Sequence, residues 1–322
     1  MFRYQYQFFG TIKPKINFDP KQDAENLYKA MKGIGCNKDK VMHVLTTINN
    51  EQRQQIALQY KSMYGKDLID SLKSELHGDF EDIILALMMT PSDYDARQLH
   101  HAISGIGTKE KILIEIICSR TNEQIHQIKK KYKENYGKLL EDEMKDDTSG
   151  HFQRLLIALL QGNRNESTVI DNLKANQAAH ELEQAGEKRL GTDESIFTKI
   201  LVTENFSQLQ QVFKDYDQIT GHSIEEAIRN EFSGDMKEGL IALVKNIQNQ
   251  PGYFAFELYQ AMKGLGTNDK VLIRIIVSRS EIDLALIKQQ YEQNYGQSLV
   301  DNIRSECSGS FRDTLIAIIK GN

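Results

Sequence analysis

The sequence contains few of the residues that interrupt helices or cross-link small domains. Its 322 residues include only four prolines, three cysteines and no tryptophan. Because proline breaks a helix interior, its scarcity beside many Leu, Ile, Lys, Gln and Glu residues favours an all-α fold. Cys36, Cys118 and Cys307 are odd in number and far apart, which excludes a disulfide framework and is typical of a reducing compartment. We therefore expect a cytoplasmic, all-helical protein.

Long apolar runs and a surplus of positive charge are also missing. The longest apolar stretches, such as residues 155–160, are far below the roughly 18 residues that a membrane-spanning helix needs. Residues 1–15 contain no long apolar segment, so no signal peptide is expected. The net charge is −5, which argues against a nucleic-acid partner. A surface of this charge would need a cation as intermediary to approach an anionic membrane.

What the chain does contain is one unit repeated four times. Each copy has a glycine loop, and the loops read MKGIGCNK, ISGIGTKE, EKRLGTDE and MKGLGTND. The glycine that closes each loop is followed by a second glycine after 30 residues and a third after 43 residues. The repeat of about 70 residues is twice the length of the common two-helix repeats. We therefore predict an all-α fold of four homologous repeats with five helices each.

The repeats also predict the domain organisation. An N-terminal segment (1–19) precedes four repeats (20–90, 91–162, 178–249 and 250–322), and a polar linker (163–177) separates the second repeat from the third. Pro91 and Pro251 lie at junctions between repeats, where proline would end one helix before the next begins. In the second repeat, Thr108 directly follows the loop and is predicted to cap the next helix.

An acidic residue at a fixed distance from each loop indicates a function. It follows the closing glycine by 40 residues in every copy: Glu75, Asp147, Glu231 and Glu306. A glycine loop alone is a common connector between helices, and duplication of a purely structural acid would give the same regularity. However, Ca²⁺ prefers about six to eight oxygen ligands, which backbone carbonyls and a carboxylate supply. Glycine has no Cβ, so it lets a loop turn several carbonyls inward.

The pattern therefore predicts four discontinuous Ca²⁺ sites, one in each repeat. Each site would combine three loop carbonyls with the acid of the same repeat, leaving coordination positions for water or a lipid phosphate. The predicted ligands are Met31, Gly33, Gly35 and Glu75; Ile103, Gly105, Gly107 and Asp147; Gly186, Arg189, Gly191 and Glu231; and Met262, Gly264, Gly266 and Glu306. The sequence has no EF-hand loop, catalytic serine elbow or nucleotide-binding loop, and no enzymatic activity is expected.

Four loops of this type, each with an acid forty residues later, resemble the Ca²⁺-site signature of the annexin family. The segments IICSRT, VSRSEIDL and DTSG also match the family, and the resemblance covers about residues 20–320. It implies a slightly curved disc whose Ca²⁺ loops, on the convex face, press against phosphatidylserine-type anionic phospholipid membranes. It also implies that the N-terminal segment is where a protein partner would bind.

Two copies depart from the family pattern. The first has Cys36 and Lys38 where annexins usually have Thr and Glu, so a secondary Ca²⁺ site is not expected there. The third lacks the first glycine of its loop, and the family uses an upstream glycine in this variant, here Gly186. The alternative function is that of a helical scaffold for protein–protein interaction, in which the loops are only structural.

Two arginines lie at the ends of nearly apolar predicted helices. Arg120 and Arg279 follow the runs KILIEIICS and KVLIRIIVS, where an unpaired charge would be costly. Each is therefore predicted to have a buried acidic partner.

Overall fold

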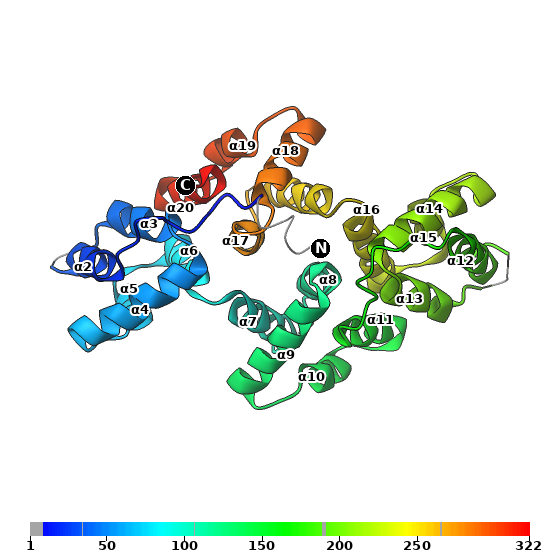
Figure 1. Cartoon of the computed structure of the whole chain (residues 1–322), viewed down its shortest axis with the longest axis horizontal. Coiled ribbons are helices and arrows are strands. Elements are labelled where there is room, and N and C mark those ends of the chain that lie inside the picture. The colour runs from blue at the N-terminus through cyan, green and yellow to red at the C-terminus, as the bar shows by residue number, and fades with distance from the viewer. Residues whose placement is uncertain (1–8, 34, 106, 189–190, 265) are drawn as a thin grey trace. The chain divides into compact units, whose positions relative to one another are not determined.

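The computed structural model describes residues 9–322 apart from 34, 106, 189–190 and 265. Within that part of the chain every regular element is an α-helix (Figure 1). The helices form two compact units, one made of the chain up to Pro91 with Pro251–Asn322, and the other made of Ser92–Gln250. The predicted all-α fold class is confirmed.

Each repeat contributes five helical segments. The first repeat contains α2 (Pro20–Met31), α3 (Lys38–Thr46), α4 (Asn50–Tyr64), α5 (Leu68–Glu75) and α6 (Gly78–Met88). The second contains α7 (Pro91–Ile103), α8 (Glu110–Ser119), α9 (Asn122–Tyr136), α10 (Leu140–Asp147) and α11 (Gly150–Leu160). The third contains α12 (Asn172–Ala185), α13 (Glu194–Thr203), α14 (Phe206–Thr220), α15 (Ile224–Glu231) and the first part of α16 (Gly234–Met262). The fourth contains the rest of α16 with α17 (Asp269–Arg279), α18 (Leu284–Tyr295), α19 (Leu299–Glu306) and α20 (Gly309–Lys320).

Both proline junctions are helix boundaries. Pro91 is the first residue of α7, a position where its fixed φ suits the helix and its missing N–H has no partner to lose. Inside α16, Asn249 has non-helical backbone angles (φ −157°, ψ 87°) two residues before Pro251. The break at Asn249 therefore separates the last helix of the third repeat from the first helix of the fourth.

The repeated glycines end the third helix of each repeat. These helices, α4, α9, α14 and α18, all stop at a glycine with a left-handed φ between 65° and 81°. Such a residue closes the last turn with its N–H, and glycine adopts this φ without a Cβ penalty. The four glycines are Gly65, Gly137, Gly221 and Gly296. The glycine that follows each loop by 30 residues in the sequence thus marks the end of a helix.

The second helix of the second repeat is central to its core. All residues of α8 from Leu113 to Ser119 are buried. Arg120, directly after α8, makes two hydrogen bonds to the carboxylate of Asp95 at 2.7 and 2.9 Å. In the other unit, Arg279 makes two to the carboxylate of Asp283, both at 2.7 Å. The prediction of a buried acidic partner is confirmed for both arginines.

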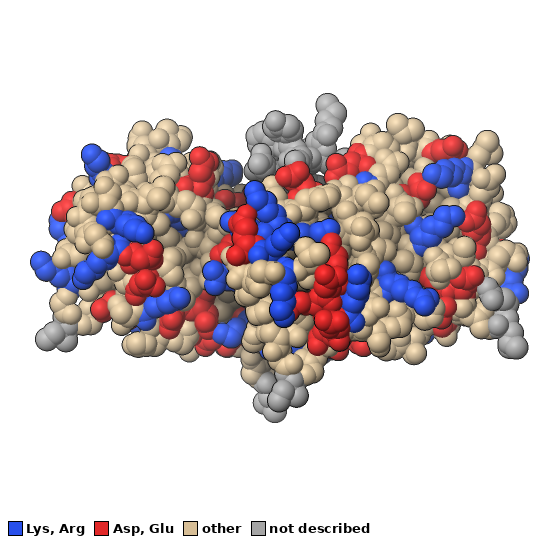
Figure 2. All heavy atoms as spheres, turned by 90° about the horizontal axis from the view of Figure 1, so that it is seen from below, with Lys and Arg blue, Asp and Glu red and all other residues tan. Residues whose placement is uncertain are grey.

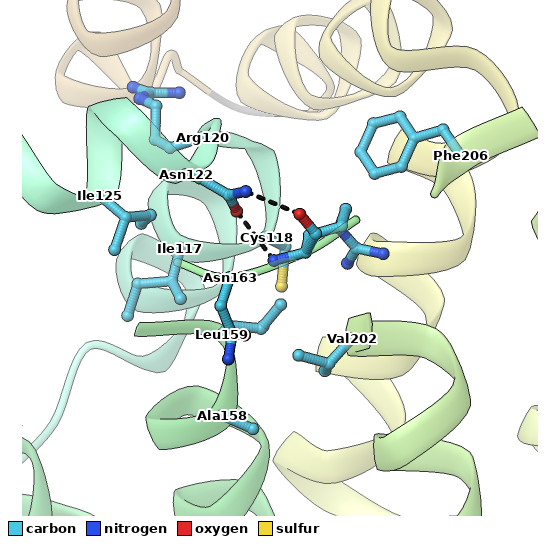
Figure 3. Close-up of a pocket in the computed structure, with 11 residues that line it drawn as sticks. Ile117, Cys118, Arg120, Asn122, Ile125, Ala158, Leu159, Asn163, Val202 and Phe206 are labelled. Carbon is cyan, nitrogen blue, oxygen red and sulfur yellow. Dashed lines mark hydrogen bonds between the residues drawn. The ribbon is translucent and has the colours of Figure 1, made fainter. Parts of the chain in front are cut away.

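The segment between the second and third repeats is fixed to neighbouring helices. The side chain of Asn122 exchanges two hydrogen bonds with the backbone of Arg164, at 2.8 and 3.1 Å (Figure 3). The guanidinium of Arg164 donates to the carbonyl of Glu204 at 2.7 Å. The helix α12 begins at Asn172, inside the predicted linker (163–177). The carboxylate of Asp171 caps this helix by accepting from the N–H of Lys174.

Candidate calcium sites

Each glycine loop joins the first helix of a repeat to the second, and a backbone hydrogen bond closes it. In every repeat the residue two positions after the closing glycine donates its N–H to the carbonyl of an alanine near the end of the preceding helix. These bonds are Asn37 to Ala30, Lys109 to Ala102, Asp193 to Ala185 and Asn268 to Ala261, at 2.8 to 2.9 Å. The third loop holds one more residue than the others, and Gly186 occupies the place of Met31 directly after the alanine.

The backbone conformation at the end of each loop favours glycine over other residues. Their φ angles are 83°, 80°, 83° and 80° at Gly35, Gly107, Gly191 and Gly266. A Cβ added at these positions would meet no atom within 4 Å, so strain of the left-handed backbone, and not lack of space, would disfavour a side chain. All four are exposed. Glycine therefore lets each loop turn its carbonyls without crowding.

The first glycines of the loops are not equivalent. Gly33 and Gly264 have positive φ angles of 113° and 110°, whereas Gly105 does not adopt this conformation. The second loop therefore differs from the first and the fourth in its backbone at one predicted ligand position.

The predicted acids all occupy the same structural position. Each is the last residue of the fourth helix of its repeat, in α5, α10, α15 and α19. The residue after it is extended and donates its N–H to the carbonyl four positions back, which ends the helix. The acids are Glu75, Asp147, Glu231 and Glu306; the first three are half-buried and the last is exposed.

Threonines bring two of the loops to the acids of their own repeats. Thr108 donates through Oγ1 to the backbone carbonyl of Asp147 at 3.0 Å. Thr192 donates through Oγ1 to the carboxylate of Glu231 at 2.8 Å. The prediction that Thr108 caps α8 is wrong, because Lys109 is the N-cap residue and its side chain makes no capping bond. The hydroxyl is used for the long-range contact instead.

In the first and fourth repeats, other observations place the glycine loop near the acid of the same repeat. A hollow of about 290 Å³ in the first repeat is lined by Met31, Gly33 and Glu75, three of its predicted ligands. In the fourth, burial and the negative charges of Asp269 and Glu306 raise the pKa of the Cys307 thiol to about 11. Asp269 begins the helix after the loop, so the loop and the acid-bearing helix end lie near one another there as well.

The residues of the second site fit a bound cation. Asp147 Oδ2 is buried and has no hydrogen-bond partner among the described residues. A buried polar oxygen without a partner is costly, and a positive ion beside it would remove that cost. The described residues contain no group of three or more His, Cys, Asp or Glu side chains able to hold a metal. A site of backbone carbonyls with one carboxylate would have no such group.

The third site is described only in part. Gly186 is buried, and a Cβ added to it would lie 3.6 Å from the side chain of Glu231, which places this predicted ligand beside the acid. Arg189, also a predicted ligand, lies outside the described residues. The loop threonines that contact the acids were not predicted to do so, although their place directly after the closing glycine is visible in the sequence.

Comparisons with known proteins agree with the repeat pattern. The sequence model of the annexin family matches the chain four times, at residues 22–87, 94–159, 177–243 and 253–318. Annexin A11 of Homo sapiens is 50% identical over 99% of this chain, which spans 63% of the length of that relative. The solved structure of annexin III is 41% identical, covers 97% of both chains and has a TM-score of 0.95. Calcium-bound annexin (Sm)1 is 31% identical, with a TM-score of 0.87 over 96% of this chain and 93% of that one.

Fold and loops together define an all-α protein of four homologous repeats, each pairing a glycine loop with an acid. The chain belongs to the annexin family. Annexins are calcium-dependent phospholipid-binding proteins that associate with membranes peripherally and generally have no enzymatic activity. Among the described helices of this chain, none is both long and apolar enough to cross a bilayer.

Proposed function

We propose that this chain binds anionic phospholipid membranes through Ca²⁺ ions held between its four glycine loops and the acids of the same repeats. The observation that carries the proposal is the proximity of loop and acid within a repeat, seen in the contacts of Thr108 with Asp147 and of Thr192 with Glu231. The buried, unpartnered carboxylate oxygen of Asp147 supports a cation at this place.

The ligand set accounts for the need for lipid. Each site supplies one carboxylate and neutral carbonyls, so the negative charge around the ion is low and coordination positions remain open. A lipid phosphate would fill these positions with a charged oxygen. The calcium ion would in turn connect a chain of net charge −5 to a surface that is also negative. Basic and acidic side chains are intermixed on the face shown in Figure 2.

The proposal also includes two further predictions from the sequence, a cytoplasmic location and a protein partner at the N-terminal segment. A cytoplasmic location suits a protein with buried or half-buried free thiols. The N-terminal segment (1–19) is the proposed region for a protein partner, and its residues 1–8 lie outside the described part of the chain.

A vesicle sedimentation experiment tests the proposal against the scaffold alternative. We expect the protein to sediment with phosphatidylserine vesicles in calcium and to stay in the supernatant with a chelator or with phosphatidylcholine vesicles. A scaffold whose loops are only structural would stay in the supernatant under all of these conditions. That result would refute calcium-dependent membrane binding by this chain.

A further inference from the structure

The polar linker between the second and third repeats lies along the start of α14 as an extended chain. Its residues 165–171 contain no helix, turn or bend and are all exposed. The carbonyl of Val169 accepts from the side chain of Asn205 at 3.0 Å. The N–H and the carbonyl of Asp171 both bond the side chain of Gln208, at 2.7 and 2.9 Å. Side chains at the start of α14 therefore bond the backbone of every second residue at this end of the linker.

The intervening residues leave one side of the linker unpaired. Successive residues of an extended chain direct their backbone groups to opposite sides. The N–H groups and carbonyls of Thr168 and Ile170, here called the linker edge, therefore point away from α14, and none has a hydrogen-bond partner in the described part of the chain. The apolar side chains of Val169 and Leu173 beside this edge are 72% and 79% exposed. The linker edge is thus a place to which a second extended chain could add.

The corresponding edge in the first repeat is closed. Gln52, the third residue of α4, bonds the N–H and the carbonyl of Lys15, both at 2.9 Å, in the same way as its counterpart in α14 bonds the linker. One position before Lys15 stands Pro14, which has no N–H. Two positions earlier still, Ile12 donates its N–H to the carbonyl of Ser280 at 3.0 Å. Both donors that are free at the linker edge are therefore missing or paired in the first repeat.

The N-terminal segment has the sequence pattern of a strand that fits this edge. Residues 2–8 read FRYQYQF, so that aromatic residues alternate strictly with Arg3, Gln5 and Gln7. Such alternation, with aromatic residues of high β-propensity, is typical of a strand with one apolar face. The described part of the chain contains no strand with which it could pair. Arg3 is also complementary in charge to Glu166, which is exposed near the linker edge and forms no ion pair with a described residue.

We propose that residues 2–8 of one copy pair as a strand with the linker edge of a second copy, so that the chain self-associates. The free backbone groups of Thr168 and Ile170 gain partners, and the aromatic face covers the exposed side chain of Val169, a favourable pairing across strands. Pairing between copies is possible whatever the arrangement of the two compact units, because residues 2–8 belong to one unit and the linker edge to the other.

Both partners of this pairing lie at helix ends remote from the calcium loops. The third loop precedes α13, and the carbonyl of Thr203 at the far end of that helix accepts from the N–H of Asn165 at 2.9 Å. Ten helical residues separate the two ends by about 15 Å. In the fourth repeat, Ser280 follows the far end of α17, and its carbonyl accepts from the N–H of Thr11 at 2.7 Å. The inference names a partner for the N-terminal segment and does not depend on calcium.

Sedimentation equilibrium of the full chain in chelator tests the proposal. Ile170→Pro removes a donor that has no partner within the described chain, so it should block pairing while the circular dichroism stays helical. Tyr4→Ser with Tyr6→Ser interrupts the aromatic alternation. We expect the parent to self-associate with increasing concentration, and each variant to raise the Kd by at least roughly tenfold. The control, Ile16→Ser with Leu58→Ser, removes side chains that are 97% and 72% exposed elsewhere and should associate like the parent.

A mixture of the two variants distinguishes this pairing from other modes of self-association. The Ile170→Pro chain keeps its N-terminal segment, and the chain with both tyrosines exchanged keeps its linker edge. An equimolar mixture should therefore form heterodimers at concentrations where each variant alone is monomeric. A parent that stays monomeric, a control that loses association to the same extent, or a mixture that stays monomeric would each overturn the proposal.

Vesicle sedimentation keeps this inference separate from the proposed function. Both variants should still sediment with phosphatidylserine vesicles in calcium, because neither exchange touches a glycine loop or its acid. If the parent binds these vesicles but does not self-associate, the inference fails and the proposed function stands. If the parent self-associates in chelator but does not bind vesicles in calcium, the proposed function fails and the self-association stands.

Discussion

At the scale of single residues, the four predicted calcium ligand sets differ in ways that should affect occupancy. The second repeat has the shorter acid, Asp147, where the others have glutamate. Its loop also lacks the left-handed φ that Gly33 and Gly264 share. We therefore predict that, in a structure determined with calcium, the second loop is the one most prone to lack an ion. Occupancy there with vacancies at Glu75 and Glu306 would contradict this.

Exchanging the acid tests in solution whether its side-chain length determines calcium affinity. Asp147→Glu should tighten calcium binding by the second loop, because the longer side chain reaches the ion with both oxygens. We expect a change of roughly tenfold at that site in a calorimetric titration. Glu306→Asp, the reverse exchange, should weaken binding by the fourth loop. If the two exchanges act in the same direction, side-chain reach is not what distinguishes the sites.

The buried ion pair of the fourth repeat should matter for stability far more than a surface pair. Arg279 and Asp283 are 2% and 0% exposed and make two hydrogen bonds with each other. Asp283→Ala leaves the guanidinium buried without its carboxylate, which should cost about 3–5 kcal/mol in the free energy of unfolding. Asp313→Ala, which removes an exposed partner of Arg312, should cost less than about 1 kcal/mol. Urea titrations of the two variants provide the comparison.

At the scale of elements, the helix α10 lacks the N-terminal capping side chain that the corresponding helices of the other repeats have. The fourth helices α5, α15 and α19 begin after a capping side chain, from Asp67, Ser223 or Ser298. The corresponding residue of α10 is Leu139, which is 47% exposed and cannot accept a hydrogen bond. We predict that Leu139→Ser stabilises the protein by about 0.5–2 kcal/mol.

The matched control for this prediction reverses the exchange in another repeat. Ser298 accepts from the N–H of Asp301 at 3.1 Å, so Ser298→Ala should destabilise the protein by a similar amount. Midpoints of urea unfolding monitored by circular dichroism measure both variants. Loss of stability in Leu139→Ser would mean that the exposed leucine has packing value that outweighs the missing cap.

The ends of helices could be predicted from the sequence where a single local interaction determines them. A glycine that ends a helix does so through its own backbone, and Gly137, one of the glycines that follow the loops by 30 residues, ends α9 in the structure. Thr108 was predicted wrongly as a cap because Lys109 holds the N-cap position, whereas the hydroxyl of Thr108 donates to the carbonyl of Asp147, 39 residues away in the sequence. Likewise, Asp171 starts α12 earlier than the polar composition of the linker suggested. Local capping rules cannot decide between partners that only the folded chain brings together.

The charged hollow of the first repeat was not predictable for the same reason. Lys32 lies in the first glycine loop and Lys66 lies after α4, so the two lysines are separated by the whole of α3 and α4. Repeat comparison shows that their residue types differ between copies, but only the folded structure shows that they line one space.

At the scale of the whole molecule, each predicted site would offer one carboxylate and neutral carbonyls, so its affinity for free calcium should be weak, on the order of 10⁻⁴–10⁻³ M. A lipid phosphate that completes the shell adds negative charge and must tighten calcium binding by the same factor by which calcium tightens lipid binding. Several such sites engaging one membrane would multiply this effect through avidity. We therefore expect steep calcium dependence of vesicle binding, at concentrations well below those that saturate the lipid-free protein.

Two glutamates at the predicted sites should control this dependence without contributing to the fold. Glu75→Gln with Glu306→Gln should shift vesicle binding to higher calcium, because each exchange removes the only charged ligand of its site, while the helical circular dichroism stays unchanged. Glu51→Gln with Glu181→Gln removes the same charge from exposed helix positions and should leave the curve in place. Calcium titrations with and without phosphatidylserine vesicles measure the shift. If the titrations with and without lipid coincide for the parent, or if the loop variant binds vesicles as the control does, calcium does not bridge these sites to the membrane.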